Sequence, residues 1–152
     1  MKEINNNIKE SYCSFEVSKL LKEKEFDVEC LHFYTKPKSK MYGIDEHGRA
    51  YPIKNTSKKL YTFGQHASSK DDNVYLAPTH ALAIEWIRVN FGIWIEVPHI
   101  NTYGVNRFHI IVWKYNEEDY HSIYTEDGGY IVFDSPQEAT EAALKYVLEI
   151  LI

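Results

Sequence analysis

The chain has 152 residues, of which 44% are apolar and 26% charged, with a formal net charge of −5. These proportions match ordinary globular domains and exclude wholesale disorder or a fibrous protein. No run approaches the roughly 18 apolar residues of a membrane span, and the polar start of the sequence lacks the apolar segment of a secretion signal. We therefore expect a cytoplasmic protein without membrane association.

Charge is distributed unevenly along the sequence. Residues 1–76 carry 13 basic and 11 acidic side chains, whereas residues 77–152 carry 4 basic and 11 acidic side chains. Residues 35–70 alone hold eight basic side chains against Asp45 and Glu46. This pattern predicts a molecule with a positive end and a negative end.

The first half of the chain predicts one helix and several short strands. Residues 1–13 are polar and rich in asparagine, and we expect a flexible arm there. A helix is predicted from an N-cap at Ser14 to about Lys24, because apolar residues recur on one face. A strand is expected over residues 29–34. Apolar runs on both sides of the polar turn at residues 45–48 indicate a hairpin, and a long polar loop is expected after it.

Residues 75–97 predict a strand, a helix and a second strand in succession. Thr79 is a suitable N-cap for a helix through about Phe91, and Gly92 can adopt the left-handed conformation that ends a helix. Ile93 to Val97 alternates as a strand with its isoleucines inward. Residues 108–115 are apolar on both faces, which favours one central strand that pairs with Ile93–Val97.

The end of the chain predicts a hairpin and a long helix. Residues 121–125 and 130–134 flank two glycines that suit a turn. Ser135 and Pro136 open a capping box, and the helix that follows has a wide apolar stripe that includes Ile150. A second apolar row suggests contact with another element or with a second subunit, as a homodimer. Its members are Leu144, Leu148 and Ile152.

These elements predict a single α+β domain over residues 14–152, with a mainly antiparallel sheet and about three helices. Four segments share a recognisable pattern: Ala77-Pro78-Thr79, Trp86-Ile87-Arg88, Ile93 to Val97 and Phe133 to Leu148, with Ser14 to Lys24 as a weaker match. In these segments the chain resembles small uncharacterised proteins encoded by phages and mobile elements of Bacteroidetes bacteria. The resemblance covers about half the chain and implies an accessory protein of viral or mobile-element origin. It implies no activity and transfers no functional residues.

Histidines and cysteines give the candidate chemical sites. None of the seven histidines lies in a local metal-binding motif. His99, His109 and His121 flank strands expected to be neighbours, so with nearby carboxylates they are the candidate site of a small metal-dependent enzyme. A structural or surface role is the commoner fate of single histidines. Cys13 and Cys30 lack CxxC spacing, and we expect reduced thiols in or near the core.

The Lys-rich segment is a candidate interaction surface. Lysines interleaved with aromatic residues suit a surface that contacts phosphates and stacks on bases, although a merely solvated face has the same composition. The residues are Lys54, Lys58, Lys59, Tyr42, Tyr51, Tyr61 and Phe63. With no catalytic motif, we expect no cofactor and a non-enzymatic accessory protein that binds a macromolecule, with protein favoured over nucleic acid as the partner.

Overall fold

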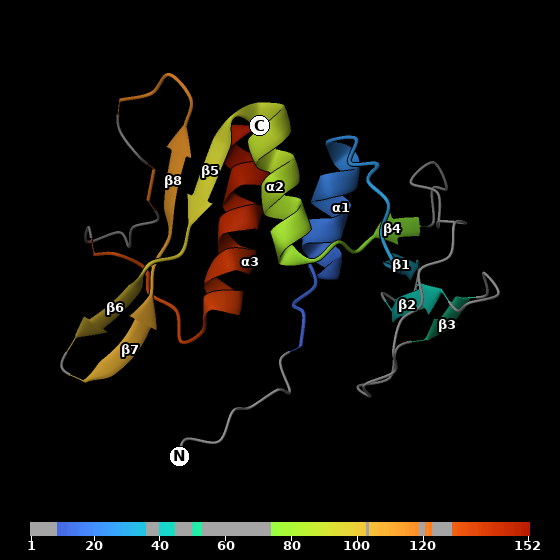
Figure 1. The fold of residues 1–152 in the computed structure, drawn as a ribbon, viewed down its shortest axis with the longest axis horizontal. Coiled ribbons are helices and arrows are strands. Elements are labelled where there is room, and N and C mark those ends of the chain that lie inside the picture. Colours follow the sequence, from blue (N-terminus) through green and yellow to red (C-terminus); the bar gives the residue numbers. More distant parts are fainter. Residues whose placement is uncertain are drawn as a thin grey trace, which may run out of the picture.

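The structure is a computed structural model, and it describes residues 9–35, 40–44, 50–52, 74–102, 104–118, 121–122 and 129–152. In this part of the chain three helices lie at the centre of the molecule. A four-stranded sheet lies on one side of them, and two two-stranded sheets lie on the other (Figure 1). Every strand pairing is antiparallel. The predicted α+β fold class is confirmed.

The three helices begin at the predicted caps. In α1 (Phe15–Glu23) the Ser14 hydroxyl accepts from the Val17 amide at 3.2 Å. In α2 (His80–Phe91) the Thr79 hydroxyl accepts from the Leu82 amide, and in α3 (Pro136–Tyr146) the Ser135 hydroxyl accepts from the Glu138 amide. These bonds satisfy amides that have no partner inside the helix. A π-helical turn, η1 (Val147–Leu151), continues α3.

The larger sheet has the strand order β3-β2-β1-β4. Its strands are β1 (His32–Thr35), β2 (Lys40–Ile44), β3 (Ala50–Pro52) and β4 (Val74–Leu76). The predicted β2–β3 hairpin is confirmed by its antiparallel register, while its turn and the long loop lie outside the described residues. The strand predicted over residues 29–34 is shorter and begins at His32, as a partner of both β2 and β4.

The prediction of one unbroken strand over residues 108–115 is wrong, but the predicted pairing with Ile93–Val97 is confirmed for the later part of this run, Ile111–Lys114. β5 (Ile93–Glu96) pairs with β8 (Ile111–Lys114), while β6 (His99–Thr102) and β7 (Val105–Phe108) form a separate hairpin between them. The run breaks after Phe108 because this residue exchanges backbone hydrogen bonds with Phe133, and the His109 amide donates to Pro98. Those partners are distant in sequence, so the apolar pattern alone does not reveal the break.

The predicted hairpin of residues 121–125 with 130–134 falls partly outside the described residues, which omit 123–128. Two of its ends pair elsewhere: His121 bridges to Val112, and Phe133 bridges to Phe108. Val112 and Phe108 already pair with β5 and β6, so each bridge adds a third segment at the other edge of β8 or β7.

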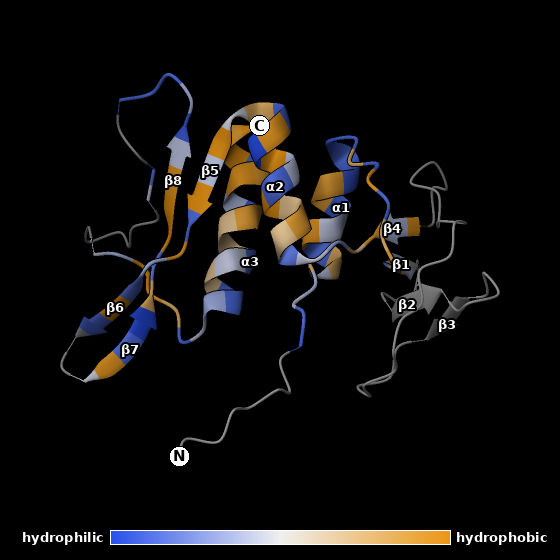
Figure 2. Ribbon diagram, viewed as in Figure 1, coloured by the Kyte–Doolittle hydropathy of each residue, from blue (hydrophilic) through white to orange (hydrophobic). Residues whose placement is uncertain are grey.

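The main core lies where α3 meets α1, α2 and the β5–β8 pair. Apolar colouring is prominent on β5 and on parts of the helices, whereas hydrophilic and apolar residues are mixed along β6 and β7 (Figure 2). Leu144 and Leu148 are fully buried, and α1 contacts both α3 and η1, so these two members of the second apolar row are covered by the chain itself and not by a second subunit. Ile152 is half-buried. Ile150 was expected in the apolar stripe but is 65% exposed, because the wider π-helical turn changes the helical period.

The flexible arm predicted over residues 1–13 is too long at its C-terminal end. The Cys13 amide donates to the Pro78 carbonyl at 2.9 Å, and the His80 amide donates to the Ser11 carbonyl at 2.9 Å. Tyr12 bridges to Thr79 between them. Ser11 to Cys13 therefore pair with the segment that leads into α2. No helix in the described ranges is both long and apolar enough to cross a membrane.

Candidate functional site

The predicted Lys-rich surface lies mostly outside the described residues. This applies to Lys54, Lys58, Lys59, Tyr61 and Phe63. The backbones of Tyr42 and Tyr51 lie in β2 and β3, where these strands pair with each other. Nucleic-acid binding by this segment stays a prediction.

The three histidines proposed as a metal site do not come together. The His99 ring contacts Asn106 at 2.8 Å, and the His121 ring contacts Glu117 at 2.6 Å. His109 lies beside the ring of Tyr130, with Nδ1 buried and without a hydrogen-bond partner. Among the described residues, one group of three metal-ligating side chains converges, and it contains none of these histidines.

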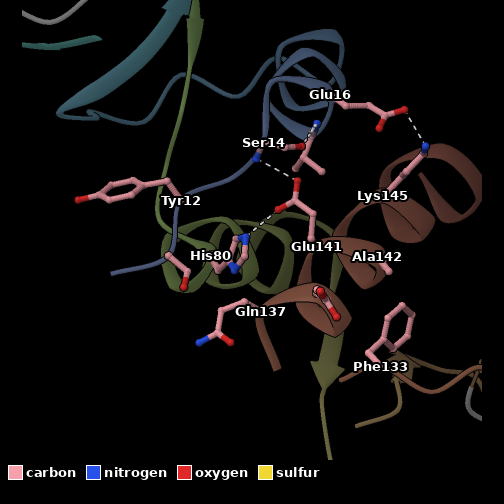
Figure 3. Close-up of a pocket in the computed structure, with 12 residues that line it drawn as sticks. Tyr12, Ser14, Glu16, His80, Phe133, Gln137, Glu141, Ala142 and Lys145 are labelled. Carbon is pink, nitrogen blue, oxygen red and sulfur yellow. Dashed lines mark hydrogen bonds and ion pairs between the residues drawn. The ribbon is translucent and has the colours of Figure 1, made fainter. Parts of the chain in front are cut away.

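An open hollow of about 690 Å³ lies between the N-terminal segment, the start of α1 and one face of α3 (Figure 3). A smaller hollow of about 290 Å³ lies next to it, and His80 lines both. Glu16 and Lys145 form an ion pair of 2.6 Å on the wall of the larger hollow. The lining therefore combines charged groups from α1, α2 and α3.

The two innermost charged groups of the hollow are His80 and Glu141, whose side chains are 13% and 27% exposed. His80 Nε2 lies 2.7 Å from Glu141 Oε2, and the Ser14 amide donates to Glu141 Oε1 at 2.9 Å (Figure 3). Since an ionised carboxylate only accepts, Nε2 carries the proton in this arrangement. Burial would raise the pKa of Glu141, but hydrogen bonds from His80 and Ser14 and the charge of His80 lower it.

Cys13 lies at the base of the same group and is fully buried. Three donor atoms, one from each of Cys13, His80 and Glu141, lie within 4.8 Å of one another. Burial, then the charges of Glu141 and Cys30, raise the pKa of the Cys13 thiol. A thiol of this kind is a poor nucleophile, so the geometry does not favour Cys13 and His80 as a nucleophile and its base. Cys13 and Cys30 are both free and buried, as predicted.

Sequence reasoning missed this group because its members are far apart along the chain. Cys13 was assigned to the flexible arm, and His80 reads only as the first residue of a helix. Glu141 reads as a solvent-facing helix residue. No local spacing relates the three positions, so only the packing of α3 against the N-terminal segment brings them together.

A second feature is an aromatic face on the outer side of the β5–β8 pair. Trp94 lies directly opposite Trp113 in the antiparallel register, so both side chains point to the same side. The inner side holds Ile93 and Val112, both fully buried. Trp94 is 53% exposed, Trp113 38% and Tyr115, which follows β8, 75%. We call Trp94, Trp113 and Tyr115 the aromatic face.

The aromatic face has a cation at one end and acidic groups near it. The guanidinium of Arg88 lies 4.9 Å from the centre of the Trp94 ring, and its Nε donates to Glu85 at 2.8 Å. Glu96, two residues after Trp94 on the same strand, points to the same outer side and is exposed. Glu117 is also exposed and follows Tyr115 closely. Sequence alternation implied an outward Trp94, but not its pairing with Trp113.

Comparison of the chain with models of known protein families, with characterised proteins and with solved structures finds no match.

Proposed function

We propose that the protein is a non-enzymatic accessory protein that acts by binding another protein through its aromatic face. The observation that supports this most directly is the exposed cross-strand pair of Trp94 and Trp113. Tryptophan, tyrosine and arginine are enriched among the residues that contribute most to binding energy at protein interfaces. An accessory role agrees with the sequence resemblance to proteins of phages and mobile elements.

The surroundings of the aromatic face favour a protein partner over a nucleic acid. Stacking of bases on tryptophan usually accompanies a basic groove for the phosphates. Here Glu85 pairs with Arg88 and Glu117 pairs with Lys114, while the exposed Glu96 lies two residues after Trp94 on the same strand. Cations that are already paired in this way do not make the basic groove that phosphates need. The partner surface that fits it combines apolar groups with lysine or arginine side chains.

The aromatic face is held in place before any partner binds. Trp94 sits on a strand paired along its length with β8, and Arg88 packs over its ring. Because little side-chain freedom remains at Trp94, less conformational entropy is lost on association. The contact with Arg88 distinguishes Trp94 from exposed apolar residues such as Ile150.

The experiment is capture of partners from a lysate of the native host on immobilised protein, run with and without nuclease. We expect a specific protein to be retained by the wild type and lost with Trp94→Ala/Trp113→Ala. Ile150→Ala, which changes an exposed apolar residue on η1, is the matched control and retains it. Capture that is equal for both variants contradicts the proposal. Capture that disappears with nuclease supports the Lys-rich segment and a nucleic acid instead.

A further inference from the structure

We infer that Cys13, His80 and Glu141 form a binding site for a divalent transition-metal cation of the Zn²⁺ type. This site is separate from the aromatic face and does not depend on the function proposed for it. The inference rests on the convergence of three different donor atoms from three distant parts of the chain, two of which, from His80 and Glu141, line an open hollow.

The distances are close to those of a metal site. The three donors lie within 4.8 Å of one another, and His80 Nε2 to Glu141 Oε2 is 2.7 Å. Ligands of tetrahedral Zn²⁺ are roughly 3.3–3.6 Å apart, given bonds of about 2.0–2.3 Å. A cation between His80 and Glu141 therefore needs these two donor atoms to separate by less than 1 Å.

The donor set selects the kind of cation. Thiolate and imidazole suit Zn²⁺ and related transition metals, whereas Ca²⁺ and Mg²⁺ prefer shells built from oxygen. On binding, the cation replaces the thiol proton of Cys13, which goes to solvent. His80 binds through Nε2 as a neutral imidazole, so its proton lies on Nδ1 in the bound form. Three protein ligands leave a fourth position toward the hollow, where water completes the coordination.

Groups around the donors hold them in orientation. The Ser14 amide donates to the second oxygen of Glu141, which leaves Oε2 directed at His80 (Figure 3). Tyr34 donates its hydroxyl to the carbonyl of Cys13 at 2.9 Å, and the Cys13 amide donates to Pro78. Such outer contacts commonly fix the ligands of metal sites. His80 and Glu141 both line the hollow, which gives a cation a route from solvent.

The test uses Co²⁺ and Zn²⁺ alone as probes of the full chain after treatment with a chelator. We expect one equivalent of Co²⁺ per chain, with a thiolate-to-cobalt charge-transfer band, and displacement of Co²⁺ by Zn²⁺. Cys13→Ser should abolish the band, and Glu141→Gln, which keeps an acceptor for the Ser14 amide, should weaken binding by about 10-fold or more. Cys30→Ser is the matched control, because it removes the other buried thiol, and it should bind as the wild type does.

Zn²⁺ should also raise the thermal unfolding midpoint of the wild type and of Cys30→Ser, since a ligand of the folded state stabilises it. Glu141→Gln should respond less at the same Zn²⁺ concentration. If Cys13→Ser does not fold, by circular dichroism, the comparison of Glu141→Gln with Cys30→Ser decides the question. Absence of a thiolate band in the folded wild type overturns the inference. So does a band that persists in Cys13→Ser or disappears in Cys30→Ser.

Discussion

The amide nitrogen of Ser14 donates to a carboxylate oxygen of Glu141 at 2.9 Å, a hydrogen bond between residues 127 positions apart in the chain. Ser14 also caps α1 with its hydroxyl, so one residue both starts that helix and attaches it to α3. The other oxygen of Glu141 meets His80 at the start of α2. One carboxylate thus links the starts of two helices to the middle of the third.

Replacing this carboxylate should destabilise the fold. We expect Glu141→Ala to lower the free energy of unfolding by about 2–4 kcal/mol, because Ser14 and His80 then lose a charged acceptor in a partly buried site. Glu141→Gln, which still accepts, should cost about 1 kcal/mol. Urea denaturation with a chelator present measures both. The exposed Glu149→Ala is the control, and a loss for Glu141→Ala no larger than for this control would contradict the expectation.

Acidification should destabilise the protein through His32. Burial lowers the pKa of His32 to about 4, although the charge of Glu10 acts in the opposite direction. Between the ordinary value of about 6.5 and pH 4 the unfolded chain binds a proton that the folded chain does not. The stability that neutral His32 contributes is therefore fully present above pH 6.5. It is lost as the pH falls to 4, and the loss in the free energy of unfolding is up to about 3 kcal/mol.

The check is denaturant unfolding of the wild type and His32→Phe at several pH values in this window. The variant cannot titrate at position 32, so its stability should fall less steeply with acid, while Glu141 acts equally in both. Parallel curves for the two proteins would show that His32 does not carry this dependence. His99→Gln is a useful comparison, since it removes a histidine from the β6 strand.

Gly92 should be sensitive to the addition of a single methyl group. Its φ is +64°, and a Cβ placed there would lie 3.0 Å from the Cβ of Tyr115. In Gly92→Ala the alanine has a strained left-handed backbone, and its Cβ lies too close to Tyr115, the residue after β8. We expect the free energy of unfolding to fall by about 1–3 kcal/mol. Gly104 has a φ of +77°, and a Cβ placed there meets no atom of the described residues within 4 Å, so Gly104→Ala measures the backbone strain alone. Equal losses for the two variants would argue against the contact with Tyr115.

Leu144 should behave as a core residue and not as an interface residue. Leu144→Ala should cost about 2–5 kcal/mol of stability through the cavity it leaves. Ile150→Ala, at a position 65% exposed, should cost less than about 0.5 kcal/mol. Thermal or urea unfolding measures both, and light scattering should give the same mass for each as for the wild type. A lower molecular mass for Leu144→Ala than for the wild type would instead support the prediction that Leu144 lies in a homodimer interface.

Local features of the sequence predicted the helices well. Ser14, Thr79 and Ser135 cap them as expected, and Gly92 ends α2 in the left-handed conformation. Each of these bonds forms within a few residues, so side-chain chemistry in a short window is sufficient. The fold class follows from the order of such segments.

Features that depend on distant partners were not predictable. The break after Phe108 arises from its bonds to Phe133, and the burial of Leu144 arises from the position of α1. Cys13, His80 and Glu141 meet only once three helices have packed. The aromatic face needed the register of β5 on β8, which the alternation of residues within one strand does not contain. Pairing between remote segments is the common cause of these failures.

The bond between Ser14 and Glu141 also has a consequence for how fast the chain folds. A contact between residues far apart in sequence requires a long loop to close. The chain loses conformational entropy on closing this loop, before the contact can stabilise it. α1 contacts both α3 and η1, so two of the helices in the core depend on such a closure. We expect refolding slower than that of a helical bundle of similar size. If this loop closes after the transition state for folding, Glu141→Ala, which removes the bonds to Ser14 and His80, should change the unfolding rate more than the refolding rate.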